Sequence, residues 1–164
     1  MPTMPADLPK LPSRHPAWKT PSDNAPPLLP VPVDAAPARR VLVVEDTEIN
    51  RRLVRVLMTK KGWVVDEAEN GCLALAALAA SSYDLVLMDC MMPVMNGYEA
   101  ARETRTAELA AGWDRIPIIG LTASAIEGDR ERCLAAGMDD YLAKPFSAKA
   151  LAAMVEHWAP QPVS

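Results

Sequence analysis

The chain has 164 residues, a formal net charge of −4 and a sequence isoelectric point near 5.2. This mild acidity disfavours binding to nucleic acid or to an anionic membrane surface, since both usually need a basic patch. No apolar run approaches the roughly 20 residues that cross a bilayer, and the N-terminus lacks the pattern of a secretory signal, so we expect a cytoplasmic protein.

Residues 1–38 hold eleven of the sixteen prolines and show neither a helical nor an alternating apolar period. Because proline lacks an amide donor and fixes φ, such a segment resists both helix and sheet. The composition predicts a disordered or polyproline-II tail that serves as a linker or a docking arm. Trp18 and the pair Leu28–Leu29 are its candidate anchors.

From Arg40 onward, short apolar runs alternate with longer helical patterns. The predicted strands, in chain order, are RVLVVE (40–45), WVVDEA (63–68), DLVLM (84–88), IPIIGL (116–121) and YLAK (141–144). Five strands that alternate strictly with helices predict right-handed crossovers and a parallel sheet covered on both faces. The unbroken apolar run at 85–88 is typical of such a doubly covered strand.

Helical patterns follow the first three strands. The first predicted helix carries its apolar residues at spacings of i, i+4, i+7 and i+8, which places them on one face: Ile49, Leu53, Val56 and Leu57. Asn70 and Gly71 open the second helix, which runs to about residue 80. The third runs from about 98 to 110, and we expect Gly97 before it to adopt a positive φ.

Two further helices follow the last two strands. Ser124 is the predicted cap of the fourth, which carries residues 126, 133 and 134, and Gly137 suits the position after its end. Ser147 is the predicted cap of the last helix. Its apolar face is Leu151, Met154, Val155 and Trp158.

Polar side chains follow the predicted strands at the point where each one ends. Glu45 and Asp46 follow the first strand, Asp89 the third, Thr122 the fourth and Lys144 the fifth. In an open parallel sheet, ligands bind beyond the carboxyl ends of the strands. The sequence therefore predicts three carboxylates, a hydroxyl and an ammonium at one edge. Taken singly, these are weak signals, because Asp46 could cap a helix and Lys144 could be a solvated charge.

Three clustered carboxylates repel one another, and a hard divalent cation removes that repulsion. Mg²⁺ favours oxygen ligands and often joins one or two carboxylates to a phosphoryl oxygen. A carboxylate can also accept a phosphoryl group covalently. The residues alone therefore predict Mg²⁺-dependent phosphoryl transfer, with Lys144 and Thr122 stabilising the transferred charge.

Four segments carry a resemblance to a known family: VLVVEDTEINRRL, DLVLMDCMMPVMNGYEA, IIGLTASA and GMDDYLAKPFS. In order and spacing, over about residues 40–158, they resemble the receiver domain of two-component response regulators, especially receivers attached to hybrid histidine kinases. The resemblance implies a flavodoxin-like (βα)5 fold, a three-layer α/β sandwich with sheet order 2-1-3-4-5. It bounds the domain at 39–159 and leaves 160–164 as a C-terminal tail.

The resemblance also implies a role for each matching residue. Asp89 would be the phosphoacceptor, and Glu45, Asp46 and Asp89 would hold Mg²⁺ together with the backbone carbonyl of Met91. Lys144 would pair with the phosphoryl group and Thr122 would donate a hydrogen bond to it. Tyr141 matches the family's aromatic switch residue, and a cis peptide bond is expected between Lys144 and Pro145.

The implied function is a signalling switch rather than an enzyme that turns over an external substrate. A histidine kinase or a histidine phosphotransfer protein would donate the phosphoryl group, and the chain would assist its own phosphorylation and dephosphorylation. The face of the fourth helix, fifth strand and fifth helix would then change its preference for an unknown downstream protein. We expect no nucleic-acid or membrane partner, and the oligomeric state stays open.

Two alternatives use the same fold. One is an interaction module that acts without phosphorylation. The other is an aspartyl-phosphate hydrolase, which would need an acid two residues after the nucleophile, where this chain has Met91. Because a methionine side chain cannot orient an attacking water, we also expect slow loss of phosphate from Asp89.

The remaining reactive residues have structural interpretations. Cys72, Cys90 and Cys133 are odd in number and widely spaced, which predicts neither a disulfide framework nor a metal site. We expect all three to be buried thiols. Asp139 and Asp140 precede the fifth strand, so we expect them to be acids of a surface loop.

Overall fold

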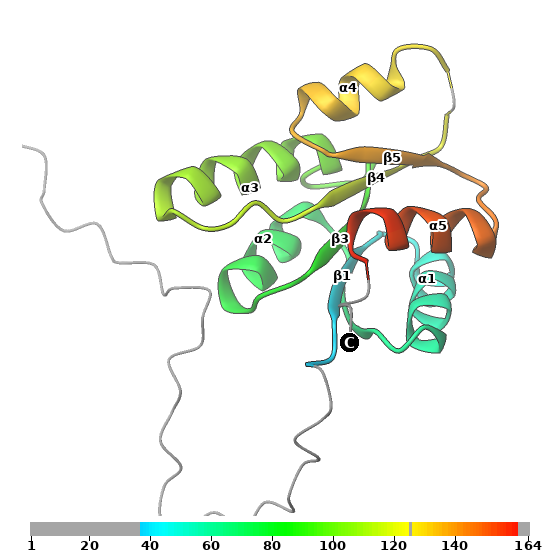
Figure 1. The fold of residues 1–164 in the computed structure, drawn as a ribbon. Coiled ribbons are helices and arrows are strands. Elements are labelled where there is room, and N and C mark those ends of the chain that lie inside the picture. The colour runs from blue at the N-terminus through cyan, green and yellow to red at the C-terminus, as the bar shows by residue number, and fades with distance from the viewer. Residues whose placement is uncertain (1–36, 125, 161–164) are drawn as a thin grey trace, which may run out of the picture.

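The computed structural model describes residues 37–124 and 126–160 (Figure 1). The segments predicted as tails, 1–38 and 160–164, lie almost wholly outside these residues, as do Trp18 and the Leu28–Leu29 pair. Within the described part of the chain, no helix combines the length and the apolar character needed to traverse a bilayer.

Five strands form one parallel sheet in the order β2-β1-β3-β4-β5, which confirms the predicted topology. The strands are β1 (Arg40–Val44), β2 (Val64–Ala68), β3 (Leu85–Asp89), β4 (Ile118–Thr122) and β5 (Asp140–Ala143). All five residues of β3 are buried, and so are all five of β4. Both faces of these central strands are covered, as the unbroken apolar runs predict.

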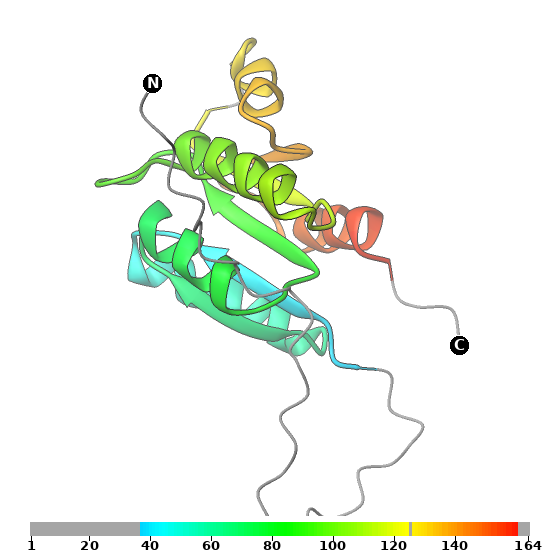
Figure 2. The same ribbon diagram turned by 90° about the vertical axis from the view of Figure 1, so that its left-hand side faces the viewer.

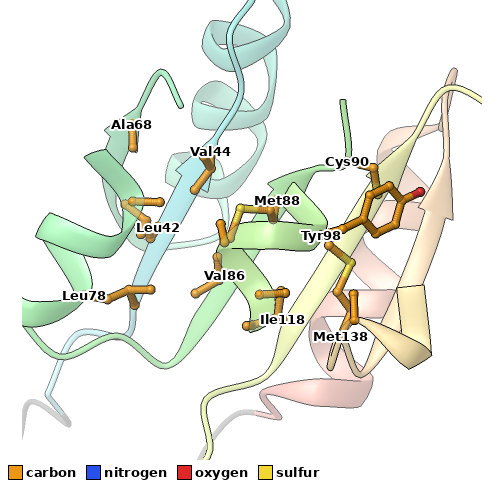
Figure 3. Close-up of a cluster of buried hydrophobic side chains, with 14 of the residues drawn as sticks. Leu42, Val44, Ala68, Leu78, Val86, Met88, Cys90, Tyr98, Ile118 and Met138 are labelled. Atoms are coloured by element: carbon orange, nitrogen blue, oxygen red, sulfur yellow. The ribbon is translucent and has the colours of Figure 1, made fainter. Parts of the chain in front are cut away.

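The helices are α1 (Glu48–Lys60), α2 (Gly71–Ala80), α3 (Gly97–Ala111), α4 (Asp129–Ala135) and α5 (Ala148–Trp158). Side chains of β1 and β3 alternate between two buried clusters. Leu42 and Val86 pack under α2, α3 and α4 (Figure 3), whereas Val41 and Leu85 pack under α1 and α5. Figure 2 shows α2 and α3 in front of the sheet and α5 behind it, which is the predicted three-layer sandwich.

Side-chain caps define where several helices begin. The Asn70 side chain accepts a hydrogen bond from the amide of Leu73, 2.9 Å away. Asn96 and Glu99 form a reciprocal capping box at the start of α3, which satisfies two amides that the helix leaves unpaired. Ser147 caps α5, as predicted, by accepting from the amide of residue 150 at 3.0 Å.

The buried face of α1 differs from the predicted one. Val54 and Met58 are buried, with Leu57 partly buried beside them, while Ile49 and Leu53 are 75% and 54% exposed. The helix carries two apolar stripes, each with helical spacing, and periodicity alone does not decide which of them faces the sheet. The prediction of the helix was right, but the apolar face that the spacing identified is not the face that packs against the sheet.

The predicted start of α4 was also wrong. The Ser124 hydroxyl accepts a hydrogen bond from the amide of Ile126 at 3.2 Å, so it stabilises a local turn and not a helix end. The helix begins at Asp129, after Gly128 with φ of 107°. Gly137 follows the end of α4 with φ of 95°, as predicted.

Gly97 is needed for a reason other than the predicted positive φ. The residue with positive φ in this loop is Val94, at 71°. A Cβ on Gly97 would lie only 2.1 Å from the backbone oxygen of Asp89. Glycine therefore allows the start of α3 to approach the end of β3 closely.

The chain enters and leaves the sandwich at one pole. Arg39, just before β1, donates from Nη1 to the backbone oxygen of Ala159, just after α5, across 2.6 Å. This pole holds the amino end of β1, so it lies opposite the carboxyl ends of the strands.

Candidate functional site

The predicted site residues come from four strand ends at one edge of the sheet. Glu45 and Asp46 directly follow β1, and Asp89 is the last residue of β3. Thr122 ends β4, and Lys144 directly follows β5. Parallel pairing aligns these ends, since Asp89 lies opposite residue 121 and Thr122 opposite residue 143.

The three carboxylates converge. One carboxylate oxygen from each of Glu45, Asp46 and Asp89 lies within 4.8 Å of the others. Glu45 is 1% exposed and Asp89 6% exposed, whereas Asp46 is open to solvent. Two buried acids and one exposed acid, with oxygen donors only, match the ligands that a hard divalent cation prefers.

Lys144 is the cation that the protein itself brings to this cluster. Its Nζ lies 2.5 Å from Oε2 of Glu45 and 3.5 Å from Oδ2 of Asp89. Burial opposes its charge, but the hydrogen bond to Glu45 and the charge of Asp89 outweigh burial and raise the pKa of Lys144. A single ammonium against three carboxylates leaves the cluster with excess negative charge.

Asp89 ionises reluctantly in the metal-free site. Burial, and then the neighbouring charge of Glu45, raise its pKa to about 7, while Lys144 and a hydrogen bond from the Met91 amide oppose the rise. That amide donates to Oδ1 of Asp89 across 3.2 Å. Added positive charge at the cluster would favour the ionised carboxylate, which is the nucleophilic form.

Thr122 ends the strand next to β3, whereas Tyr141 lies on β5 opposite residue 120. The Thr122 hydroxyl is buried, donates to the backbone oxygen of Ser124 at 3.2 Å and accepts from the Ser124 amide at 3.3 Å. It is thus held by the loop after β4. Tyr141 is half-buried and packs against the buried apolar side chains under α3 and α4.

Two further predictions concern the loops around Asp89 and Lys144. The Lys144–Pro145 peptide bond is cis, as expected. The Met91 side chain is 64% exposed, so it offers the site no polar group and no buried contact. A ligand role for the Met91 carbonyl remains a prediction.

The sequence interpretation missed exposed apolar side chains in the segments that follow β1 and β3. Ile49 and Leu53 of α1 are exposed, as is Val94 after β3, at 84%. A hollow of about 320 Å³ opens beside Lys144 and is lined by Leu53 and Phe146 among others. The detectable signal was the apolar stripe of α1 that includes Ile49 and Leu53, which the spacing had placed only on one face of the helix.

Arg51 is a positioning residue that the sequence interpretation also missed. Its Nη1 donates to the backbone oxygen of Glu45 across 2.9 Å, and its guanidinium also pairs with Glu67 and Glu69. The arginine thereby ties α1 to the loop that presents the acidic pair.

Two expectations about reactive residues need correction. Cys90 and Cys133 are buried, as expected, but Cys72 is exposed. Asp139 is not a free surface acid, because it pairs with the partly buried guanidinium of Arg105 across 2.8 Å. Asp140 belongs to β5, and its Oδ2 accepts from the indole of Trp158 at 3.0 Å.

Comparison with known proteins places the whole described sandwich in one family. The family model described as "response regulator receiver domain" matches residues 41–156. The sensor protein GacS of Pseudomonas syringae is 39% identical over 137 residues, which cover 84% of this chain and 14% of that protein. The matches span between 6% and 15% of the curated relatives' lengths.

Solved structures agree with this match. The receiver domain of the sensor histidine kinase PA1611 of Pseudomonas aeruginosa, with a magnesium ion in its active-site cleft, is 40% identical with a TM-score of 0.68. The alignment covers 76% of this chain and 99% of that one. The receiver domain of Saccharomyces cerevisiae Ssk1, crystallised with the phosphotransfer protein Ypd1, belongs to a match at 32% identity and a TM-score of 0.72, covering 75% and 90%.

Proposed function

The chain belongs to the response regulator receiver domain family and is a receiver module of two-component signalling, and we propose that Asp89 is its phosphoacceptor. The supporting observation is the convergence of Glu45, Asp46 and Asp89 with the ammonium of Lys144. Asp89 is the acid of the group that ends a fully buried strand, and its Oδ2 lies 3.5 Å from the Nζ of Lys144.

Mg²⁺ is the proposed cofactor, and the residues present fit it. Glu45, Asp46 and Asp89 would hold it, together with the backbone carbonyl of Met91. When bound, the ion supplies positive charge that neutralises the carboxylates and the phosphoryl oxygens. The magnesium site in the related PA1611 receiver supports this proposal.

The chain's own residues carry the transfer. A carboxylate oxygen of Asp89 attacks the phosphorus of a phosphohistidine, an O–P bond forms, the P–N bond breaks, and the imidazole leaves. Lys144, already within 3.5 Å of Asp89, pairs with the phosphoryl oxygens. No side chain near Asp89 needs to donate a proton to the phosphoryl group, so the reaction depends on position and charge.

The proposed switch starts at Thr122. Its hydroxyl donates to the Ser124 backbone oxygen in the unphosphorylated protein. A phosphoryl oxygen is a stronger acceptor, and donating to it would release the loop after β4. Tyr141 and the face formed by α4, β5 and α5 would then change their preference for a downstream protein.

The donor is a histidine kinase or a histidine phosphotransfer protein. The exposed stripe of Ile49 and Leu53 beside the site gives such a donor an apolar surface to cover. Binding of the related Ssk1 receiver to Ypd1 supports this choice. The protein would act in the cytoplasm, and its only reactions would be its own phosphorylation and dephosphorylation.

A small acyl-phosphate donor with Mg²⁺ tests the proposal directly. Intact mass should show one added phosphoryl group on the native protein and none on Asp89→Asn. Asp84→Asn is a matched control, since Asp84 lies before β3 at the opposite pole, and it should accept phosphate normally. Phosphate on the Asp89→Asn protein would refute the site, and a native protein that never gains phosphate would favour a phosphorylation-independent module.

A further inference from the structure

Two buried cysteines meet beside the proposed phosphoacceptor. Cys90 directly follows β3, and Cys133 lies on α4. Their Sγ atoms are 3.8 Å apart and neither residue is exposed. Gly120 leaves space next to them, since a Cβ there would lie 3.2 Å from each sulfur. We propose that Cys90 and Cys133 form an oxidisable dithiol site that hydrogen peroxide converts to a disulfide.

The geometry requires only a small movement. The sulfurs of a disulfide are about 2.0 Å apart. Because the two thiols are already in contact, bond formation needs only a small approach of the sulfur atoms and no rearrangement of the sheet. Cys90 is anchored by its amide, which donates to the backbone oxygen of Leu121 at 2.9 Å. Closure of the pair therefore falls to Cys133 and α4.

The structure also provides a route for the oxidant. Cys133 is the one buried residue within α4, which has seven residues and begins at Asp129, after Gly128, without a side-chain cap. Figure 1 shows this helix at the margin of the fold, beyond β5. Helices this short gain little from their own hydrogen bonds. Local opening of α4 exposes Cys133 without unfolding the sheet.

The reaction balances with hydrogen peroxide as the sole oxidant. The Cys133 thiol releases its proton, the thiolate attacks one peroxide oxygen and the O–O bond breaks, which gives a sulfenic acid and hydroxide; the hydroxide takes up the released proton and leaves as one water. When α4 closes, Cys90 attacks the Cys133 sulfur, the S–S bond forms, and the hydroxyl leaves as a second water with the thiol proton. Two thiols have lost two electrons and two protons.

The disulfide would fasten α4 to the residue next to Asp89. Its consequence for signalling rests on the proposed function: an oxidised protein would still accept phosphate, but α4 would no longer move in response. Oxidation would thus act on the output face and leave the acceptor chemistry intact.

Peptide mapping in a Cys72→Ser background tests the site, because exposed Cys72 reacts on its own account. After peroxide treatment, denaturation and alkylation, we expect a linked Cys90–Cys133 peptide that has lost two hydrogens and that a dithiol reductant restores. Adding Cys133→Ala should remove that peptide. The site is overturned if both thiols stay alkylatable under peroxide conditions that oxidise Cys72 in the native chain, or if Cys133 reaches sulfinic acid without a linked peptide.

Hydrogen exchange tests the restraint on α4. Amides of residues 129–135 should exchange about tenfold more slowly in the oxidised protein, and phosphorylation should change their rates only in the reduced protein. Equal rates in the two redox states would overturn the restraint. A linked peptide in a protein that never accepts phosphate would overturn the proposed function and leave the dithiol site standing.

Discussion

At the scale of single residues, Asp89 carries an electrostatic cost that its sequence position conceals. It lies buried at the carboxyl end of β3 beside Glu45, and Lys144 compensates for only part of the two charges. Burial and Glu45 raise the pKa of Asp89 to about 7. The folded protein therefore binds this proton more tightly than the unfolded chain does, and the associated stability is lost as pH rises through 7.

We expect Asp89→Asn to stabilise the metal-free protein. Above pH 7 the substitution removes a buried charge, so the free energy of unfolding should rise by about 1–2 kcal/mol. Below pH 5 the difference should shrink, because Asp89 is then protonated. Urea unfolding at both pH values measures this effect. Asp46→Asn is the matched control: its carboxylate is exposed, so the metal-free protein should gain little.

With Mg²⁺ added, we expect the native chain to become more stable than Asp89→Asn. Binding to the native state alone stabilises a protein by mass action, so Mg²⁺ should raise the melting temperature of the native chain, and chelation should undo the shift. Both Asn variants should lose most of this response. A full Mg²⁺ response in Asp89→Asn would contradict the proposed ligand set.

Met91 sets the expected lifetime of the phosphorylated state. Its exposed apolar side chain cannot orient a water for attack on the phosphoryl group. Replacement by Asn or Glu supplies a polar group, and we expect dephosphorylation several-fold faster. Intact mass over time measures the lifetime, and Met91→Leu, which stays apolar, should leave it unchanged. Equal lifetimes in all four proteins would show that the side chain at position 91 does not control the rate of dephosphorylation.

At the scale of elements, an arginine joins α3 to the connection between α4 and β5. Arg105 is largely buried, with its side chain 11% exposed, and its guanidinium pairs with Glu108 and Asp139 at 2.8 Å each. It also donates to the backbone oxygens of Ile116 and Gly137 at 2.9 and 2.8 Å. This single side chain thus satisfies acceptors from three segments.

Arg105→Ala should cost about 3 kcal/mol of stability, since it leaves one buried and one partly buried carboxylate and two carbonyls without this partner. Arg115 offers a matched control, because it pairs with the same Asp139 from an exposed position. Arg115→Ala should cost less than about 1 kcal/mol. Denaturant unfolding of the two variants gives the comparison, and similar losses would show that the buried network carries no special weight.

Periodicity predicted each strand and four helix positions closely, because a doubly covered sheet needs unbroken apolar runs. It failed where two physical signals competed. The side chain of Ser124 binds its own turn, so α4 starts later, at Asp129. On α1, two stripes have equal helical spacing, and the pattern could not show that Leu53 stays exposed beside the site.

The site was predictable for a different reason. Parallel strands bring their carboxyl ends to one edge, so Asp89 and Lys144 were expected to meet although 55 positions separate them. The buried state of Asp89, the loop that holds Thr122, and the approach of Gly97 to the Asp89 carbonyl depend on tertiary contacts. Sequence spacing contains no information about these three features.

At the scale of the whole molecule, exposed apolar residues near the site provide a candidate surface for the phosphoryl donor. We expect Leu53→Asp to slow phosphotransfer from a histidine phosphotransfer protein by at least about tenfold. Phosphorylation by a small acyl-phosphate should be unchanged, because that donor needs no docking surface. Leu109→Asp is the matched control, since Leu109 is equally apolar and 86% exposed but lies on α3.

Comparison of the two phosphoryl donors separates a loss of docking from damage to the site. A Leu53→Asp protein that loses both reactions has a damaged site and says nothing for docking through α1. A protein that keeps both, at native rates, shows that the donor approaches over another face.

The bond between Arg39 and Ala159 has a mechanical meaning for any longer chain that carries this sandwich. Segments joined before β1 and after α5 leave the sandwich from neighbouring points. Motion of those segments would therefore rotate the sandwich about this point and would not pull its two ends apart. The acidic edge lies at the opposite pole, so it would stay accessible to the protein that donates the phosphoryl group.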